Sequence, residues 1–251
     1  FIDSTVTEIK AKAFEGCSAV KKVTLPPALV TIENNTFDGC TSLTEITIPS
    51  TVTKIGKFAF NNCKALKKLD LPDSIKTIGE SALSNCVSLE EVKLPSTLTS
   101  IEYSTFSKCE SLKEISIPET VTNLGGHCFN GCISLTEIEI PQGITVIPES
   151  AFNDCKSLNK VSIHASIDSI GNCAFSSCES LSDFQIPNSV KKIGNSSFSS
   201  CKKLQKIELP ESITSIGNHA FFDCQSLSEV SLLCTINTIE DSLFAKCISL
   251  T

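Results

Sequence analysis

Cysteine recurs every 23 residues along almost the whole chain, with no insertion or deletion between one occurrence and the next. The positions are Cys17, Cys40, Cys63, Cys86, Cys109, Cys132, Cys155, Cys178, Cys201, Cys224 and Cys247. A strict period of this length is typical of stacked repeats, because one short unit cannot bury its own apolar side chains. We therefore predict that residues 1–251 form one continuous solenoid of about eleven repeats.

The first half of each repeat has the pattern of a β-strand. Leu follows the cysteine by three residues, apolar residues follow at six and eight, and Pro usually follows at nine, as in Ile115, Ile117 and Pro118. Alternation with a period of two predicts a strand with one buried face. Pro ends the strand because it lacks the N–H that a ladder needs. Stacking should bring these strands into a parallel sheet.

The second half of each repeat is predicted to turn twice. Gly often stands sixteen residues after the cysteine, and its tolerance of positive φ predicts a corner there. The closing small-Phe-x-x-Cys segment, for example 59–63, predicts a short helical or 3-10 turn. Phe fills its slot in all repeats except the one with Leu83, so we expect a buried Phe column. Because these turns are bulky, the stack should curve with the sheet on its concave face and the turns on its convex face.

The whole unit, L-x-x-I-x-L-P-x-x-L-x-x-I-G-x-x-A-F-x-x-C, resembles the BspA-like, or Treponema-pallidum-type, class of leucine-rich repeats. The resemblance covers essentially the whole chain and implies a right-handed, curved α/β solenoid. It also implies a non-enzymatic protein on the surface of a host-associated microbe, acting in adhesion or recognition, and it carries over no binding residues. The chain departs from the pattern at Cys128 and Leu243 (Ala slot), His164 and Leu233 (Pro slot) and Pro148 (Gly slot).

The charge and composition narrow the classes of partner. The chain has 21 basic and 28 acidic residues, net −7, and every basic residue is Lys. This balance disfavours nucleic acid, whose phosphates attract a basic face. No apolar run approaches the roughly 18 residues of a membrane span, and no signal peptide is recognisable. Because Met is absent and the first residues start within the repeat pattern, we expect a segment of a longer protein.

The sequence offers no constellation for catalysis, a cofactor or a metal. No Ser lies near a His in the repeat frame, and the glycines follow no phosphate-binding pattern. Fourteen cysteines suggest disulfides or metal ligands, but repeat stacking gives the column parallel side-chain directions, which makes bridges awkward. We interpret the cysteines as small buried hydrophobes. His127, Cys128 and Cys132 are close in sequence, yet a fourth ligand for zinc is missing.

The most regular exposed feature is a column of charged residues five positions after each cysteine. It reads Lys22, Glu45, Lys68, Glu91, Glu114, Glu137, Lys160, Asp183, Lys206 and Glu229. The favoured interpretation is a solubilising ladder of cross-strand ion pairs. The alternative is a concave protein-docking face, with Glu91, Glu114 and Glu137 as an acidic patch flanked by Lys68 and Lys160.

Three further features complete the sequence expectations. Asn34 and Asn195 begin N-glycosylation patterns. Phe58 and Phe222, beside the Phe column, are candidate anchors for a partner if they are exposed. Because stacks need polar end units and none is evident here, we expect fraying or end-to-end self-association.

Two functions stay open on the sequence. One is a surface adhesion or recognition scaffold that binds proteins or glycoproteins, located at the cell surface or secreted. The other is an intracellular scaffold, which suits unpaired cysteines because reducing compartments keep thiols free. A repeat module attached to a catalytic domain is a third arrangement that the full-length sequence would reveal.

Overall fold

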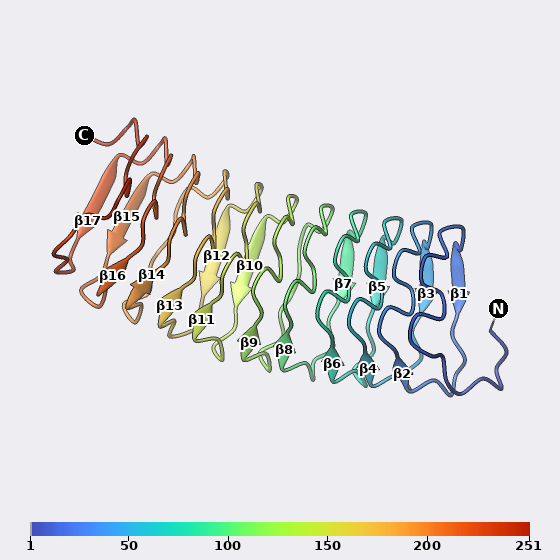
Figure 1. The fold of residues 1–251 in the computed structure, drawn as a ribbon. Coiled ribbons are helices and arrows are strands. Elements are labelled where there is room, and N and C mark those ends of the chain that lie inside the picture. Colours follow the sequence, from blue (N-terminus) through green and yellow to red (C-terminus); the bar gives the residue numbers. More distant parts are fainter. Residues whose placement is uncertain (1) are drawn as a thin grey trace.

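The computed structural model describes residues 2–251 as one elongated stack of similar coils, with the two chain ends at opposite ends of the stack (Figure 1). Each coil is one 23-residue repeat. Within the described residues the regular elements are seventeen short parallel strands and no helix. The prediction of a parallel-strand solenoid is therefore confirmed, and the prediction of helical or 3-10 turns is wrong.

One set of strands corresponds to the predicted sheet, and we call its exposed side the first-strand face. The set comprises β1 (Lys22–Thr24), β3 (Glu45–Thr47), β5 (Lys68–Asp70), β7 (Glu91–Lys93), β10 (Glu137–Ile140), β12 (Lys160–Ile163), β15 (Lys206–Leu209) and β17 (Glu229–Leu232). These strands pair two by two, β1 with β3, β5 with β7, β10 with β12 and β15 with β17. Residues 113–117 and 183–187 occupy the same place in their coils without forming a strand.

A second set of two-residue strands lies where the sequence predicted a corner. It comprises β2 (Thr31–Ile32), β4 (Lys54–Ile55), β6 (Thr77–Ile78), β8 (Ser100–Ile101), β9 (Asn123–Leu124), β11 (Val146–Ile147), β13 (Ser169–Ile170), β14 (Lys192–Ile193) and β16 (Ser215–Ile216). They form three sheets in the orders β2-β4-β6, β8-β9 and β11-β13-β14-β16. The ladder is interrupted between β6 and β8 and between β9 and β11.

Glycine controls this second ladder through close approach and not through positive φ. The repeat glycines are Gly56, Gly79, Gly125, Gly171, Gly194 and Gly217, and each donates its N–H to the Ile carbonyl of the preceding coil at 2.7–2.9 Å. A Cβ on Gly56 would lie 2.6 Å from the backbone N of Asn34, so no larger residue fits. None of these six has positive φ, which corrects the sequence prediction.

The two interruptions fall where the sequence lacks this glycine. Glu102 follows β8 and Pro148 follows β11, and neither strand pairs with the coil before it. A Glu side chain needs the space that a glycine leaves to the neighbouring backbone, and Pro has no N–H to donate. The presence or absence of glycine therefore matches where the second ladder runs and where it stops.

The closing turns are not helical because two residues in each coil have a left-handed backbone. In one coil these are Asn35 (φ 56°) and Gly39 (φ 73°), and the same two slots have positive φ in the other coils. The N–H groups therefore alternate. Phe37 donates to Ala59 O in the next coil, while Asp38 donates to Asn35 O within its own turn. A helix would direct all of them within the coil.

The interior is filled by stacked columns, as the repeat predicts. Neighbouring Phe rings lie parallel with centroids 5.3–5.6 Å apart, and Leu83 separates Phe60 from Phe106. Phe60, Phe106 and Phe152 are fully buried in one continuous core. The Phe column is therefore confirmed as the main packing element.

Two polar ladders accompany the apolar columns. Nine of the column thiols donate S–H to a Phe carbonyl one turn back at 3.1–3.2 Å, and Cys109 donates to Leu83 O at 3.3 Å. Hydroxyl groups eleven residues after the cysteine also donate to carbonyls of the preceding coil, and the apolar repeat pattern does not predict them. They are Thr51, Ser74, Thr97, Thr120, Ser189 and Ser212.

Candidate partner-binding face

The charged column lies on the first-strand face, and its ion pairs coincide with the strand pairs. The Nζ to carboxylate distances are 2.7 Å for Lys22–Glu45, 2.9 Å for Lys68–Glu91, 3.8 Å for Lys160–Glu137 and 2.6 Å for Lys206–Glu229. Each pair joins the first residues of two hydrogen-bonded strands. The ladder interpretation therefore describes the eight charges that lie on strands, although exposed pairs of this kind contribute only about 0–1 kcal/mol each.

The predicted acidic patch is present as three exposed carboxylates on successive coils, but its members differ in their surroundings. Glu91 is bonded to Lys68, and this hydrogen bond raises the pKa of Lys68. Glu137 lies near Lys160. Within residues 2–251, Glu114 has no ion pair, and neither does Asp183 further along the column. Both occupy the coils without a strand.

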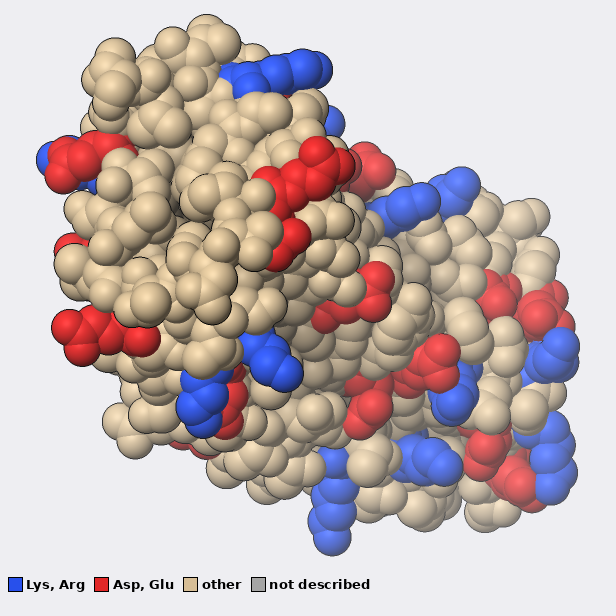
Figure 2. Space-filling view, turned by 60° about the vertical axis from the view of Figure 1, so that its left-hand side comes forward, with Lys and Arg blue, Asp and Glu red and all other residues tan. Residues whose placement is uncertain are grey.

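The charges on the molecular surface are mixed. Figure 2 shows Lys side chains interspersed with acidic ones, and several acidic side chains gather across the middle of the view. Such a surface resists non-specific association and offers polar groups of both signs to a partner. The described residues contain no helix that is long and apolar enough to cross a bilayer.

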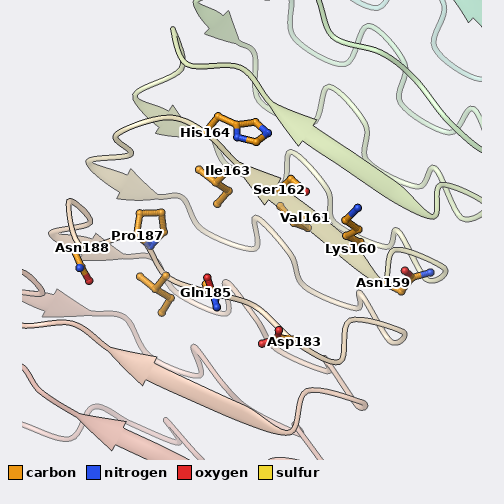
Figure 3. Close-up of a pocket in the computed structure, with 11 residues that line it drawn as sticks. Asn159, Lys160, Val161, Ser162, Ile163, His164, Asp183, Gln185, Pro187 and Asn188 are labelled. Atoms are coloured by element: carbon orange, nitrogen blue, oxygen red, sulfur yellow. The ribbon is translucent and has the colours of Figure 1, made fainter.

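The first-strand face is opened by a groove between β12 and residues 183–188. The groove has a volume of about 610 Å³. Figure 3 shows Lys160 to His164 on one side and Asp183 to Asn188 on the other. Val161 and Ile163 occupy slots that are buried in most coils, yet both are only partly buried here. The groove therefore exposes part of the apolar core beside polar and charged side chains.

Phe184 distinguishes this junction from the others. Its slot holds Ile, Val or Leu in the other coils. Phe184 is 4% exposed, and its ring centroid lies 5.0 Å from Phe175 in one coil and 4.9 Å from Phe198 in the next. An extra ring between these two levels takes up space that the smaller residues do not. The repeat pattern identifies this slot only as apolar and therefore does not predict the groove.

A second cavity of about 550 Å³ lies along the second-strand edge beside the interruption at Glu102. Lys57, Glu80 and Tyr103 line it, and Lys57 and Glu80 form an ion pair of 2.8 Å. Tyr103 is 48% exposed and its ring contacts His127 at a centroid distance of 5.2 Å. Its two acidic groups and two lysines are typical of an exposed polar edge.

The two glycosylation patterns have exposed asparagines and buried hydroxyls. Asn34 and Asn195 are exposed, but Thr36 and Ser197 are 1% and 0% exposed. The Asn34 and Asn195 Oδ1 atoms also accept the backbone N–H of Lys57 and of Asn218, at 2.8 and 2.9 Å. An enzyme that must engage the hydroxyl could modify these sites only before the chain folds.

The cysteines are free, and those of the interior are chemically protected. All fourteen are unpaired thiols, and the column members from Cys40 to Cys224 are buried. Burial raises the pKa of Cys86 and of Cys132 to about 12. Thiolate is the reactive form, so these groups are poor nucleophiles and poor metal ligands. In residues 2–251 no three His, Cys, Asp or Glu side chains are placed to hold a metal ion.

The proposed aromatic anchors are less available than the sequence suggested. Phe58 and Phe222 are both half-buried. The Lys246 ammonium lies 4.8 Å above the Phe222 ring, and His219 packs beside the same ring. These contacts cover the Phe222 ring, so it is less available to a partner than the sequence suggested.

The comparisons with known proteins agree with this architecture. The family model described as "BspA type Leucine rich repeat region (6 copies)" matches residues 7–136 and 125–251. A leucine-rich cell-surface protein of Faecalibacterium prausnitzii is 29% identical at a TM-score of 0.66, over 99% of this chain and 76% of that one. The Treponema pallidum leucine-rich repeat protein TpLRR is 30% identical at a TM-score of 0.61, over 64% of this chain and 78% of that one. No curated protein sequence matched.

Proposed function

Because this chain belongs to the family of BspA-type leucine-rich repeat proteins, we propose that it is a non-enzymatic, protein-binding scaffold that works in recognition or adhesion at a cell surface or after secretion. The observation that carries the proposal is the first-strand face, where a regular charge ladder is interrupted by unpaired Glu114 and Asp183 and by an open groove. Exposed charged groups that have no ion pair within the described residues are available to a partner.

The proposed location is supported by the relative from Faecalibacterium prausnitzii, which is named a cell-surface protein. The free cysteines do not oppose this location. Burial keeps the interior thiols protonated, and protonated thiols exchange slowly even where the surroundings are oxidising. An intracellular scaffold is the second candidate, and the same fourteen free thiols are the observation that favours it.

We expect a right-handed stack, as the family resemblance implies. The predicted concave position of the first-strand face is a separate expectation. On the inside of a bend the coils lie closest, so their hydrogen bonds should be most complete there. The first-strand ladder is interrupted after every pair of strands, whereas three hydrogen bonds join every pair of neighbouring closing turns. The interrupted ladder therefore argues against a first-strand face that lies compressed on the inside of a strong bend. Binding of a partner requires only that the face be accessible.

Binding can be tested with a charge reversal on the face and a matched one off it. The proposed probes are purified extracellular-matrix proteins and serum glycoproteins, each presented to the immobilised chain. We expect at least one to bind and Glu114→Lys to weaken it about tenfold, because it inverts an unpaired charge on the face. Glu110→Lys makes the same change on an exposed residue of the turn and should leave the affinity unchanged. Equal behaviour of the two variants, or no binding at all, would refute the proposed face.

Location can be tested on intact source cells with a membrane-impermeant amine reagent. The exposed side chains of Lys22, Lys68 and Lys160 are suitable targets. Labelling of intact cells, with cytosolic proteins unlabelled as the control, would support the surface location. Labelling only after lysis would support the intracellular scaffold.

End-to-end association of the stack is a further part of the proposal. Leu233 and Ile248, in the last coils, are 53% and 79% exposed, and they offer apolar area to a second stack. Light scattering across a range of protein concentrations should show the mass rising. A constant monomer mass would contradict this expectation.

A further inference from the structure

We propose that the groove between β12 and residues 183–188 binds an extended segment of a partner protein, which adds a strand to the free edge of β12. The segment would have apolar residues at alternating positions and one Lys or Arg opposite Asp183. This inference rests on the proposed function, since the groove opens on the first-strand face, and it specifies which part of a partner is recognised and how.

The free edge of β12 supplies the backbone groups for such pairing. β12 pairs only with β10, and the described residues contain no backbone hydrogen bond between β12 and residues 183–187. The N–H groups of Lys160 and His164 donate toward the β10 side, to Thr136 O and Ile140 O. Alternate residues of a strand point their backbone groups to opposite sides. The N–H and C=O groups of Val161 and Ile163 therefore face the groove and are available to a guest strand.

The groove runs along the four residues of β12, Lys160 to Ile163, and has a volume of about 610 Å³. Four residues of a strand extend about 13 Å. A single side chain would leave most of this space empty, so an extended segment is the shape that suits both the open backbone edge and the length of the groove.

The lining sets the chemistry of the segment. Val161, Ile163 and Ile186 provide apolar surface, so every second guest side chain should be apolar. Asp183 is exposed and has no ion pair in residues 2–251, whereas Lys160 already has Glu137 3.8 Å away. The unbalanced charge in the groove is therefore negative and favours a cationic guest residue. Gln185 and Asn188 add neutral hydrogen-bonding groups.

Phe184, whose ring lies between the two coils, makes the proposal testable. If Phe184 holds the two coils apart, Phe184→Ile places the residue of neighbouring repeats in that slot. The coils should then approach, the ladder should continue past β12, and the guest site should close. Asp183→Lys leaves the wedge in place and inverts only the charge of the groove. Glu110→Lys makes an equivalent charge inversion on an exposed residue of a turn outside the face, and is the matched control.

The probe is a panel of fluorescent octapeptides that alternate Val and Thr, with one Lys moved through the Thr positions. Fluorescence anisotropy with the full chain should show binding in the micromolar range for at least one register. Replacing its Lys by Glu, or N-methylating the amides that face β12, should weaken binding by about tenfold or more. Asp183→Lys should have the same effect, Phe184→Ile should abolish binding, and Glu110→Lys should leave it unchanged.

Several results would overturn the proposal. These are no binding by any peptide, equal binding of the N-methylated peptide, and equal affinities for Asp183→Lys and Glu110→Lys. A chain that dimerises through the groove would also overturn it, because the occupant would then be a second copy. If Phe184→Ile fails to fold, Asp183→Lys and the N-methylated peptide still decide. If no peptide binds the groove but a matrix protein still binds, and Glu114→Lys weakens that binding, the groove is rejected as the binding site and the proposed function stands.

Discussion

The glycine of the second ladder gives a quantitative test of how the coils are held together. Gly194 lies in the middle of the four-stranded sheet β11-β13-β14-β16. Its N–H donates to Ile170 O at 2.8 Å, and a Cβ there would lie 2.5 Å from Asn172 N and 2.6 Å from the carbonyl carbon of Gly171. These neighbours are backbone atoms and cannot rotate away. In Gly194→Ala the two coils must separate locally.

The expected loss follows from two contributions. Forcing a methyl group into a packed site costs about 1–3 kcal/mol. Losing the inter-coil hydrogen bond adds about 0.5–1.5 kcal/mol. We therefore expect Gly194→Ala to lower the free energy of unfolding by about 2–4 kcal/mol, allowing for partial relaxation.

Gly126→Ala is the matched control. The nearest atom to a Cβ at Gly126 is Glu149 O at 3.4 Å, and its φ is not positive. Because Ala restricts the unfolded chain more than Gly does, this variant should be neutral or gain up to about 1 kcal/mol. Gly143→Ala should lie between the two, since its clash at 2.8 Å involves the Thr122 methyl group.

Urea unfolding followed by far-ultraviolet circular dichroism is the suitable assay, because the chain has no Trp and a single Tyr. Stacked repeats can open locally, so hydrogen exchange of the amides in β13 and β14 should accompany it. Gly194→Ala should lose protection there before it loses global structure. Equal stability of Gly194→Ala and Gly126→Ala would refute close approach as the reason for the glycine.

Three other predictions test the core, the thiols and the interruption of the ladder. Phe152→Ala should lower the free energy of unfolding by about 3–5 kcal/mol, whereas Phe152→Leu should lose much less, since Leu83 already fits this column; urea unfolding of both variants would compare them. Cys86 and Cys132 have pKa values of about 12 when folded and an ordinary value of 9.0, so they stay protonated in the folded chain over a range where the unfolded chain loses protons. The contribution of these thiols to the free energy of unfolding should be fully present below about pH 9 and should decrease as the pH rises toward 12. Urea midpoints, together with thiolate absorbance, would measure this decrease. Glu102→Gly should let β8 pair with β6, and the amide at this position should then become protected from hydrogen exchange; unchanged exchange would contradict the proposed role of the slot.

The repeat pattern predicted the parts of the fold that depend on burial. Period-two alternation located the first strands, and the Phe and Cys columns were placed correctly because stacking forces equivalent side chains together. The closing turns were mispredicted because small-Phe-x-x-Cys was interpreted without its φ requirements. The residue before each cysteine was the available signal for a left-handed backbone. It is often a type that tolerates positive φ, as at Gly39, Asn62 and Asp154.

The candidate site was predictable only in part. The charged column and its face followed from the strand period, and so did the alternation that leads to the ion pairs. Which charges stay unpaired did not follow, because it depends on which coils form strands. The groove depended on a change of volume at Phe184, and a pattern that treats Phe and Ile as equally apolar cannot detect it.

Regularity itself limits where a solenoid of this kind can bind a partner. Where two strands of the first-strand face pair, as β5 and β7 do, the backbone groups bond across the junction and the column charges pair, so few groups are left for another molecule. Each departure in sequence releases one of these groups. Glu102 releases a backbone ladder, the coil of Glu114 leaves a carboxylate unpaired, and Phe184 opens a strand edge together with its apolar surface. Because only the last departure releases hydrogen-bonding, apolar and charged groups at one place, specificity should depend on Phe184 and Asp183 more than on any residue that obeys the repeat.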